Sequence, residues 1–282
     1  MPNCQYIAPT TISEVCTLLG QHGARARLVA GGQTVALDLR AHRARPNWLV
    51  ALHLIPGLDA IEQVADGLRI GALVTHEQLK MSALVRGQAT ALAQAAESIT
   101  DKQVRTTGTL GGALAARYAA CDPEAALVAL GASVIIESLS GTRTAAVEGL
   151  ALGADEVLTH VTIPTAVPGT VSVFEKFTFR EGDFAVVAVA IAVRRDPEGT
   201  ITAARVTTAN VATSPVRIPA LEAQLAGMPL TEAVIDEAGR IASAQVTPFG
   251  EPMASSEFKQ HLVGVLVRNA LRRMNGGEGQ QP

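Results

Sequence analysis

Apolar residues recur with a helical period near the start of the chain and form strand-like runs directly after it. Four of them, at positions i, i+3, i+4 and i+7, predict a helix with one buried face: Ile12, Val15, Cys16 and Leu19. Thr11 is placed to cap this helix. Apolar runs over residues 27–30 and 48–52 flank a second amphipathic segment at residues 35–42. Residues 1–55 therefore predict a compact βαβ-like unit.

A second region follows from residue 56 to residue 170. Its first two apolar runs, residues 60–64 and 68–72, are joined by an Asp-Gly turn that is typical of a β-hairpin. Thr75 is placed to cap a helix that begins at residue 76. Further on, the pattern predicts helices over residues 89–99 and 123–130 and buried strands over residues 134–136 and 156–163.

The third region, residues 171–274, shows predicted strands in its first half and predicted helices in its second half. Residues 173–179, 184–193 and 201–211 predict a three-stranded antiparallel sheet, with a turn at residues 196–199. Helices are predicted over residues 219–225, 230–244 and 255–274. Residues 275–282, which read NGGEGQQP, are expected to form a disordered tail. The fold class that this pattern indicates is α+β.

Composition removes several classes of function. Aromatic residues make up only 3% of the chain and the net charge is −3, which argues against a nucleic-acid surface. The three cysteines, Cys4, Cys16 and Cys121, lack the spacing of a metal or iron–sulfur site. Neither a signal peptide nor an apolar run of about 20 residues is visible. We therefore expect a cytoplasmic protein without a membrane span.

The common catalytic motifs do not occur in this sequence. It holds no His-Glu-x-x-His pair, no Gly-x-Ser-x-Gly elbow, no P-loop and no Gly-x-Gly-x-x-Gly fingerprint. The six histidines show no ligand spacing and are expected at the surface or at helix caps. We therefore predict no catalytic residue and no metal ligand.

Two glycine pairs are the most informative local feature. They lie in the stretches 30–34 (AGGQT) and 109–113 (TLGGA), each of which leads into a helical segment. Each pair alone is compatible with a tight turn. Together they could expose consecutive backbone N–H groups that clamp a pyrophosphate from two sides. On that interpretation, valine at Gly32 or Gly111 would occupy the space that the phosphates need.

Four segments in this order give the chain a specific resemblance: LVAGGQT (28–34), RIGALVTHEQL (69–79), VRTTGTLGGALA (104–115) and EKFTFREGDFAVVAVAIAV (175–193). They resemble the FAD-binding medium subunit of the molybdenum hydroxylases, the family of xanthine dehydrogenase and carbon monoxide dehydrogenase. The resemblance implies the two-subdomain FAD-binding fold of the vanillyl-alcohol oxidase type, here residues 1–55 and 56–170. A small α+β C-terminal domain with a three-stranded antiparallel sheet would follow.

The resemblance also implies a set of FAD-binding residues. Asp122 would accept hydrogen bonds from FAD, although it could instead cap the helix that begins at residue 123. Lys176 could be a solvated strand residue, and Phe184, next to Asp183, could be plain core. The implied site consists of Leu28, Val29, Ala30, Gly31, Gly32, Gln33, Thr34, Val35, Thr75, Ile99, Thr109, Leu110, Gly111, Gly112, Ala113, Asp122, Leu158, Lys176 and Asp183. Ala113 stands where the family carries an asparagine.

The function implied by the resemblance is that of an electron-transfer subunit. Two [2Fe–2S] clusters in a small subunit would pass electrons to the FAD of this chain, which delivers them to an external acceptor. A large subunit with the molybdenum cofactor would hydroxylate a small substrate of N-heterocyclic or aromatic type. A dimer of such heterotrimers is a further expectation. The alternatives are a stand-alone flavin oxidoreductase of the same fold and a binding or assembly module without FAD.

Overall fold

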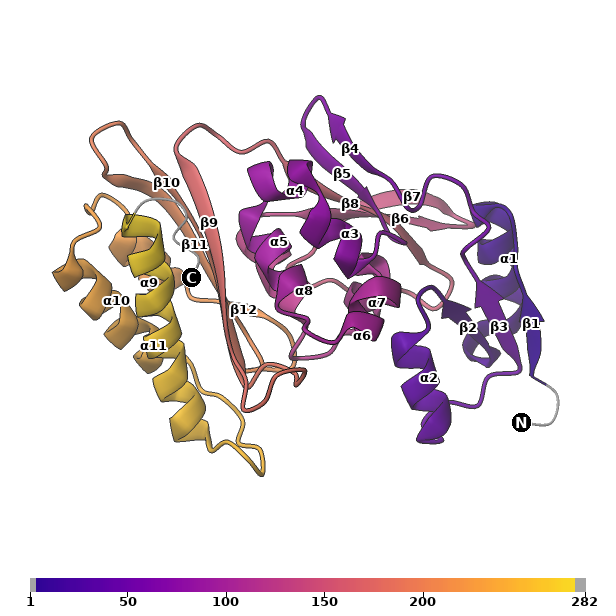
Figure 1. The fold of residues 1–282 in the computed structure, drawn as a ribbon. Helices are drawn as coiled ribbons and strands as arrows, with labels where there is room; N and C mark the ends of the chain where they lie inside the picture. The colour runs from indigo at the N-terminus through magenta and orange to yellow at the C-terminus, as the bar shows by residue number, and fades with distance from the viewer. Residues whose placement is uncertain (1–3, 277–282) are drawn as a thin grey trace.

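The computed structural model describes residues 4–276 and contains three sheets in chain order (Figure 1). The first sheet is parallel, with the strand order β1-β3-β2. The elements of this part are β1 Gln5–Ile7, α1 Ile12–His22, the 3₁₀ turn η1 Gly23–Arg25, β2 Ala26–Val29, α2 Gln33–Arg40 and β3 Trp48–Ala51. Thr11 caps α1 as predicted, because its hydroxyl accepts from the amide of Glu14.

The second sheet has five antiparallel strands and carries a group of short helices on one side (Figure 1). Across the sheet, the strands are β4 Ile61–Val64, β5 Gly67–Gly71, β8 Val157–Pro164, β6 Ser133–Ser138 and β7 Gly141–Ala146. The helices are α3 His76–Met81, α4 Ala83–Gln88, α5 Thr90–Glu97, α6 Lys102–Thr107, α7 Leu110–Ala116 and α8 Asp122–Ala129. Thr75 closes a complete capping box with Gln78 at the start of α3.

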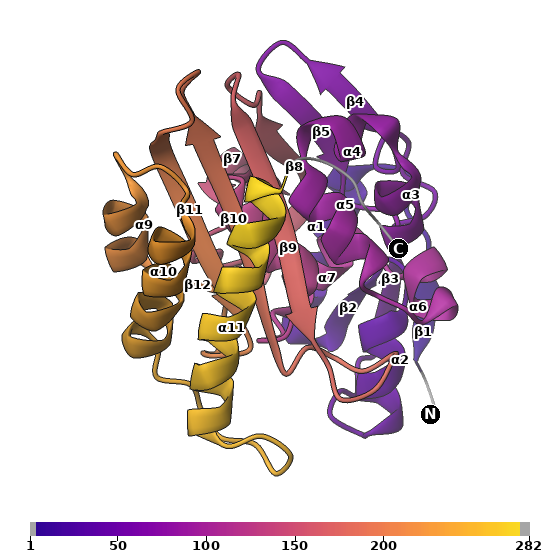
Figure 2. The ribbon, with the colours of Figure 1, turned by 60° about the vertical axis from the view of Figure 1, so that its left-hand side comes forward.

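The third sheet is antiparallel with the order β12-β11-β10-β9, and three helices cover one of its faces (Figure 2). Its elements are β9 Thr170–Phe177, β10 Val187–Arg195, β11 Ile201–Ala209, β12 Val216–Arg217, α9 Pro219–Leu225, α10 Glu232–Gln245 and α11 Ser256–Asn275. The three predicted strands are present. The fourth, β12, has only two residues, too few to produce a hydrophobic pattern.

Strand β10 explains how the second and third parts are joined. Its valine and isoleucine side chains at residues 187, 189, 191 and 193 belong to the core under α10 and α11. Ala188 and Ala190, on the opposite face, pack into the core that contains α5 and α8. Because helices cover both faces, the strand reads as a continuous apolar run. The small alanines let the helices of the second part approach closely.

Some elements carried no clear signal in the sequence. Strand β7 is exposed along most of its length and therefore lacks an apolar face. The helical segment expected after the second glycine stretch, α7, begins earlier than expected, within the stretch itself at residue 110. At the C-terminus, α11 includes Asn275, the first residue of the predicted tail, while residues 277–282 lie outside the described part of the chain. The predicted domain boundaries, near residues 55 and 170, stay predictions. No described helix is long and apolar enough to cross a membrane.

Candidate functional site

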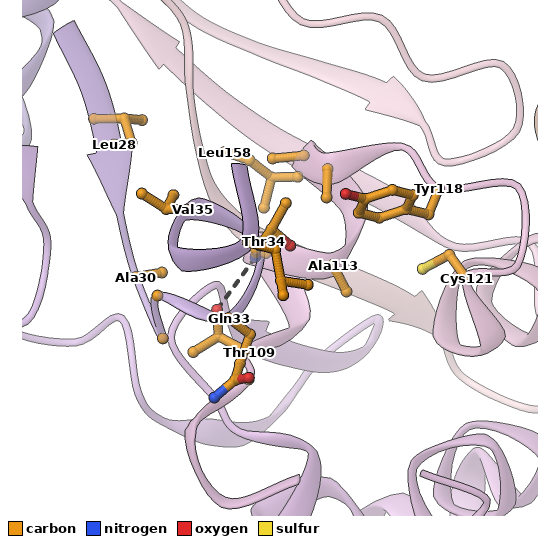
Figure 3. A pocket seen from close by; sticks show the side chains of 18 of the residues that line it. Leu28, Ala30, Gln33, Thr34, Val35, Thr109, Ala113, Tyr118, Cys121 and Leu158 are labelled. Atoms are coloured by element: carbon orange, nitrogen blue, oxygen red, sulfur yellow. Dashed lines mark hydrogen bonds between the residues drawn. The ribbon is translucent and has the colours of Figure 1, made fainter. Parts of the chain in front are cut away.

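A cavity of about 930 Å³ opens between the first part of the chain and the helices that lie between β5 and β6 of the second sheet. Figure 3 shows residues of the first glycine loop on one side of it and Ala113, Tyr118 and Cys121 on the other. Strand β8 adds Leu158, and the end of β9 adds Lys176. This volume lies at the upper end of the range typical of ligand and cofactor sites.

Most of the predicted site residues line this single cavity. Those that do are Leu28, Ala30, Gly31, Gly32, Gln33, Thr34, Val35, Ile99, Thr109, Gly111, Gly112, Ala113, Asp122, Leu158, Lys176 and Asp183. Three lie outside its lining: Val29 in β2, Leu110 in the core, and Thr75, which caps α3. Phe184 also lines the cavity and is 67% exposed, so its interpretation as plain core was wrong.

The first glycine loop offers free hydrogen-bond donors. It ends at Gly32, whose left-handed conformation (φ 74°) starts helix α2 without a side-chain cap. The backbone amides of residues 31–35 donate no hydrogen bond to any residue that the structure describes. Unpaired amides at the N-terminus of a helix attract anions, because the helix dipole adds its partial positive charge. This loop can therefore bind a phosphate or diphosphate without a basic side chain.

Gly31 has a different role from its neighbour. A Cβ atom at Gly31 would lie 1.7 Å from the carbonyl oxygen of Thr107, whereas one at Gly32 would meet nothing within 4 Å. The side-chain amide of Gln33 also donates to the Thr107 hydroxyl across 2.6 Å. Gly31 is therefore required for the contact between the first loop and the end of α6. Gly32 is required for the backbone conformation that opens α2.

The expectation that both glycine loops offer free backbone N–H donors was wrong for the second loop. The amides of Leu110 and Gly111 donate to the backbone carbonyls of Val74 and Ala72, each across 2.9 Å. The next two amides, at residues 112 and 113, donate to the hydroxyl and the carbonyl of Thr109. These donors are already engaged, so the wall formed by α7 supplies shape rather than amide hydrogen bonds.

The expected effect of valine at Gly111 must be corrected for the same reason. A Cβ atom at Gly111 would lie 2.5 Å from the Cβ atom of Ala72, which belongs to the protein and not to the open cavity. Such a substitution would disturb the packing of α7 on the segment after β5. Gly112 is the residue of this pair with the wider space around it, since its Cβ atom would meet Thr109 Oγ1 at 2.8 Å and Ala30 only at 3.9 Å.

Asp122 and Lys176 form a buried ion pair on the cavity wall. Their side chains are 5% and 9% exposed, and Lys176 Nζ lies 2.7 Å from Asp122 Oδ2. Burial raises the pKa of Asp122, and the neighbouring ammonium of Lys176 opposes that rise. The other carboxylate oxygen, Oδ1, is buried and has no partner among the described residues. A buried acceptor of this kind calls for a donor from outside the chain.

The ion pair settles two alternatives that the sequence left open. Cys121 is the N-cap residue of α8, and Asp122 is its first helical residue, so the carboxylate does not cap the helix. Lys176 is not a solvated strand residue, because its ammonium is held by Asp122 and lies 3.4 Å from the carbonyl oxygen of Ser98. Both side chains are instead part of the cavity.

Some lining residues carry no motif that could have marked them. Tyr118 and Cys121 follow α7, and the segments 43–46 and 152–154 also line the cavity. His76, expected at the surface or at a helix cap, is the first residue of α3, is 4% exposed and also lines the cavity. Burial lowers the pKa of His76 to about 4, so its imidazole is neutral at physiological pH.

The site therefore combines free amides at a helix N-terminus, a buried carboxylate oxygen without a partner and a long cavity between two parts of the chain. These features are typical of a site for a phosphate-bearing cofactor. The chain matches two family descriptions, "FAD binding domain in molybdopterin dehydrogenase" over residues 2–166 and "CO dehydrogenase flavoprotein C-terminal domain" over residues 172–274.

Individual relatives agree with this assignment. The chain is 30% identical over 277 residues to the carbon monoxide dehydrogenase medium chain of Hydrogenophaga pseudoflava, covering 96% of both. A solved carbon monoxide dehydrogenase from that organism superposes with a TM-score of 0.91 at 31% identity, over 96% of each chain. The nicotine 6-hydroxylase medium subunit of Paenarthrobacter nicotinovorans is 29% identical over 278 residues, or 96% of this chain and 97% of that one. The chain belongs to the FAD-binding medium subunits of the molybdenum hydroxylase family, a family of oxidoreductases.

Proposed function

We propose that this chain is the electron-transfer subunit of a heterotrimeric molybdenum hydroxylase. It would take electrons from [2Fe–2S] clusters of a small subunit and pass them to an external acceptor. A large subunit with the molybdenum cofactor would hydroxylate a small substrate, of N-heterocyclic or aromatic type. Two such heterotrimers would form the assembly. The observation that carries this proposal is the cavity, whose free amides and unpartnered Asp122 oxygen match a flavin dinucleotide.

The chain's own residues would hold and orient the cofactor. Bound FAD supplies the redox chemistry, since a flavin exchanges electrons singly or in pairs. The amides at the start of α2 would bind its diphosphate. Asp122 would accept a hydrogen bond through Oδ1, while the ion pair with Lys176 holds the carboxylate in place. The contact between Gly31 and Thr107 would keep the two walls of the site together.

A stand-alone flavin oxidoreductase would need an acid–base group and a substrate cover above the flavin. Two acidic side chains of the described lining are already engaged, since Asp101 caps α6 and Glu156 binds Arg143. Helices α9–α11 pack on the face of the third sheet that is remote from the cavity (Figure 2), so they add no such cover. These observations favour the electron-transfer subunit.

Flavin content tests the proposal directly. We expect the full-length chain to purify yellow, or to be reconstituted with FAD, with one flavin per chain. Asp122→Asn should weaken FAD binding about tenfold or more, because a neutral amide oxygen replaces the charged acceptor. Asp66→Asn, in the exposed turn between β4 and β5, is the matched control and should leave affinity unchanged. A folded wild-type chain that cannot bind FAD would instead support the assembly module.

The assembly is tested by co-expression with candidate partners. Co-purification with an iron–sulfur subunit and a molybdenum subunit, followed by reduction of the flavin when substrate is added to the complex, is the expected result. Oxidation of a substrate by the isolated flavin-loaded chain would contradict the proposal and favour the stand-alone oxidoreductase.

A further inference from the structure

The cavity wall formed by α7 is almost without polar side chains. Ala113 and Ala116 present only methyl groups to the cavity. Arg117 then takes the left-handed conformation (φ 51°, ψ 44°), which ends the helix and turns the chain. The next residue, Tyr118, directs its hydroxyl into the cavity (Figure 3). This hydroxyl makes no hydrogen bond to any residue that the structure describes.

A buried network holds Tyr118 in place. The backbone amide of Asn210 donates to the carbonyl of Ala119 across 2.8 Å, directly after Tyr118. The side-chain amide of Asn210 donates to the carbonyl of Ala185, also across 2.8 Å, directly after Phe184. Because one residue anchors both segments, the two aromatic rings lie side by side, with centroids 6.2 Å apart.

Asn210 is itself fixed. It is buried in the left-handed conformation (φ 59°), and its carbonyl accepts from the ammonium of Lys259 across 3.0 Å. Lys259 is fully buried and also binds Glu251. The segment after β11 thus anchors the backbone next to Tyr118, and the ring, although 39% exposed, lies beside that of Phe184.

We propose that Tyr118 is a further cofactor-binding residue, whose hydroxyl hydrogen-bonds to the FAD held in the cavity. A phenol can donate or accept, and its ring packs against an apolar ligand surface. Between the end of α7 and the start of α8, Asp122 is the other polar lining side chain, and Lys176 already occupies one of its oxygens. The inference rests on the proposed function, since it requires that FAD occupies this cavity.

The test is a titration of the full-length, flavin-free chain with FAD, followed by flavin fluorescence. Tyr118→Phe keeps the ring and its packing beside Phe184 and removes only the hydroxyl, so we expect binding about 2- to 10-fold weaker. Tyr118→Ala should weaken binding further. The matched control is Tyr6→Phe on β1, which is exposed and outside the cavity lining and should bind as the wild type does. Thermal unfolding of each flavin-free variant verifies the fold.

The outcomes of this titration test the role of the Tyr118 hydroxyl separately from the proposed function. If the wild type and Tyr6→Phe bind FAD and Tyr118→Phe binds equally well, the role of the hydroxyl is refuted while the proposed function stands. The same holds if only Tyr118→Ala is weakened, because the ring alone would then matter. If the wild type does not bind FAD, both are refuted.

Discussion

Replacing Lys176 by methionine is expected to destabilise the flavin-free protein by about 3–5 kcal/mol. Methionine retains much of the apolar stem but leaves the carboxylate of Asp122 without its partner. That carboxylate is 5% exposed and lies 2.7 Å from the lysine ammonium. With one oxygen already unpartnered, the remaining contact is the hydroxyl of Ser98 at 3.4 Å. The free energy lost is therefore that of an uncompensated buried charge.

The assay is urea unfolding followed by circular dichroism. Lys80→Met provides the matched control, because the Lys80–Glu97 pair has side chains that are 29% and 50% exposed, with a separation of 3.2 Å. That control should change the free energy of unfolding by less than about 1 kcal/mol. The double variant Asp122→Asn with Lys176→Met should lose less than the sum of the single variants, because no lone charge stays buried.

The effect should also depend on pH. Without Lys176, burial raises the pKa of Asp122 further, so protonation removes the unpaired charge as the pH falls. When the pKa of a carboxyl is higher in the folded than in the unfolded state, its contribution to stability is fully present at a pH below the unfolded-state pKa. This contribution is lost as the pH rises through the folded-state pKa. The deficit of Lys176→Met should therefore be smaller at pH 5 than at pH 8. A deficit under about 1 kcal/mol at pH 8 would refute the reasoning that the pair is desolvated.

Three further predictions concern stability. Burial raises the pKa of Glu124 to about 7, so its stabilising neutral form is lost as the pH rises from about 4.5 through 7. In urea unfolding, the free energy of unfolding of Glu124→Gln should equal that of the wild type at pH 5 and be higher at pH 8. A difference that does not change with pH would contradict this. Gly31→Ala should lower the melting temperature more than Gly32→Ala, which carries only left-handed strain of about 1–2 kcal/mol; equal losses would contradict the predicted clash with Thr107. Gln33→Leu removes the 2.6 Å bond to Thr107 and should cost about 0.5–1.5 kcal/mol in urea unfolding, and an unchanged midpoint would show that this bond contributes nothing.

The amino-acid sequence by itself determined the main elements of the fold. The helical period from Ile12, the cap at Thr75 and the run that became β10 each reflect local rules of side-chain burial and capping. The ordered segments around the two glycine loops also identified the family, and most of the site residues that the resemblance implied do line the cavity. Strand β7 could not be predicted in this way, because a strand without a buried face has no pattern.

Tertiary structure alone decided what each site residue contributes. The two glycine loops look alike along the chain, yet only the first keeps free amides, because Ala72 and Val74 accept the bonds of the second. Asp122 is the first helical residue of α8 rather than its cap, and only the fold brings Lys176, far along the chain, beside it on the cavity wall. Whether a polar group is buried and finds a hydrogen-bond partner depends on residues from distant segments that the fold brings together. A local sequence pattern does not contain this information.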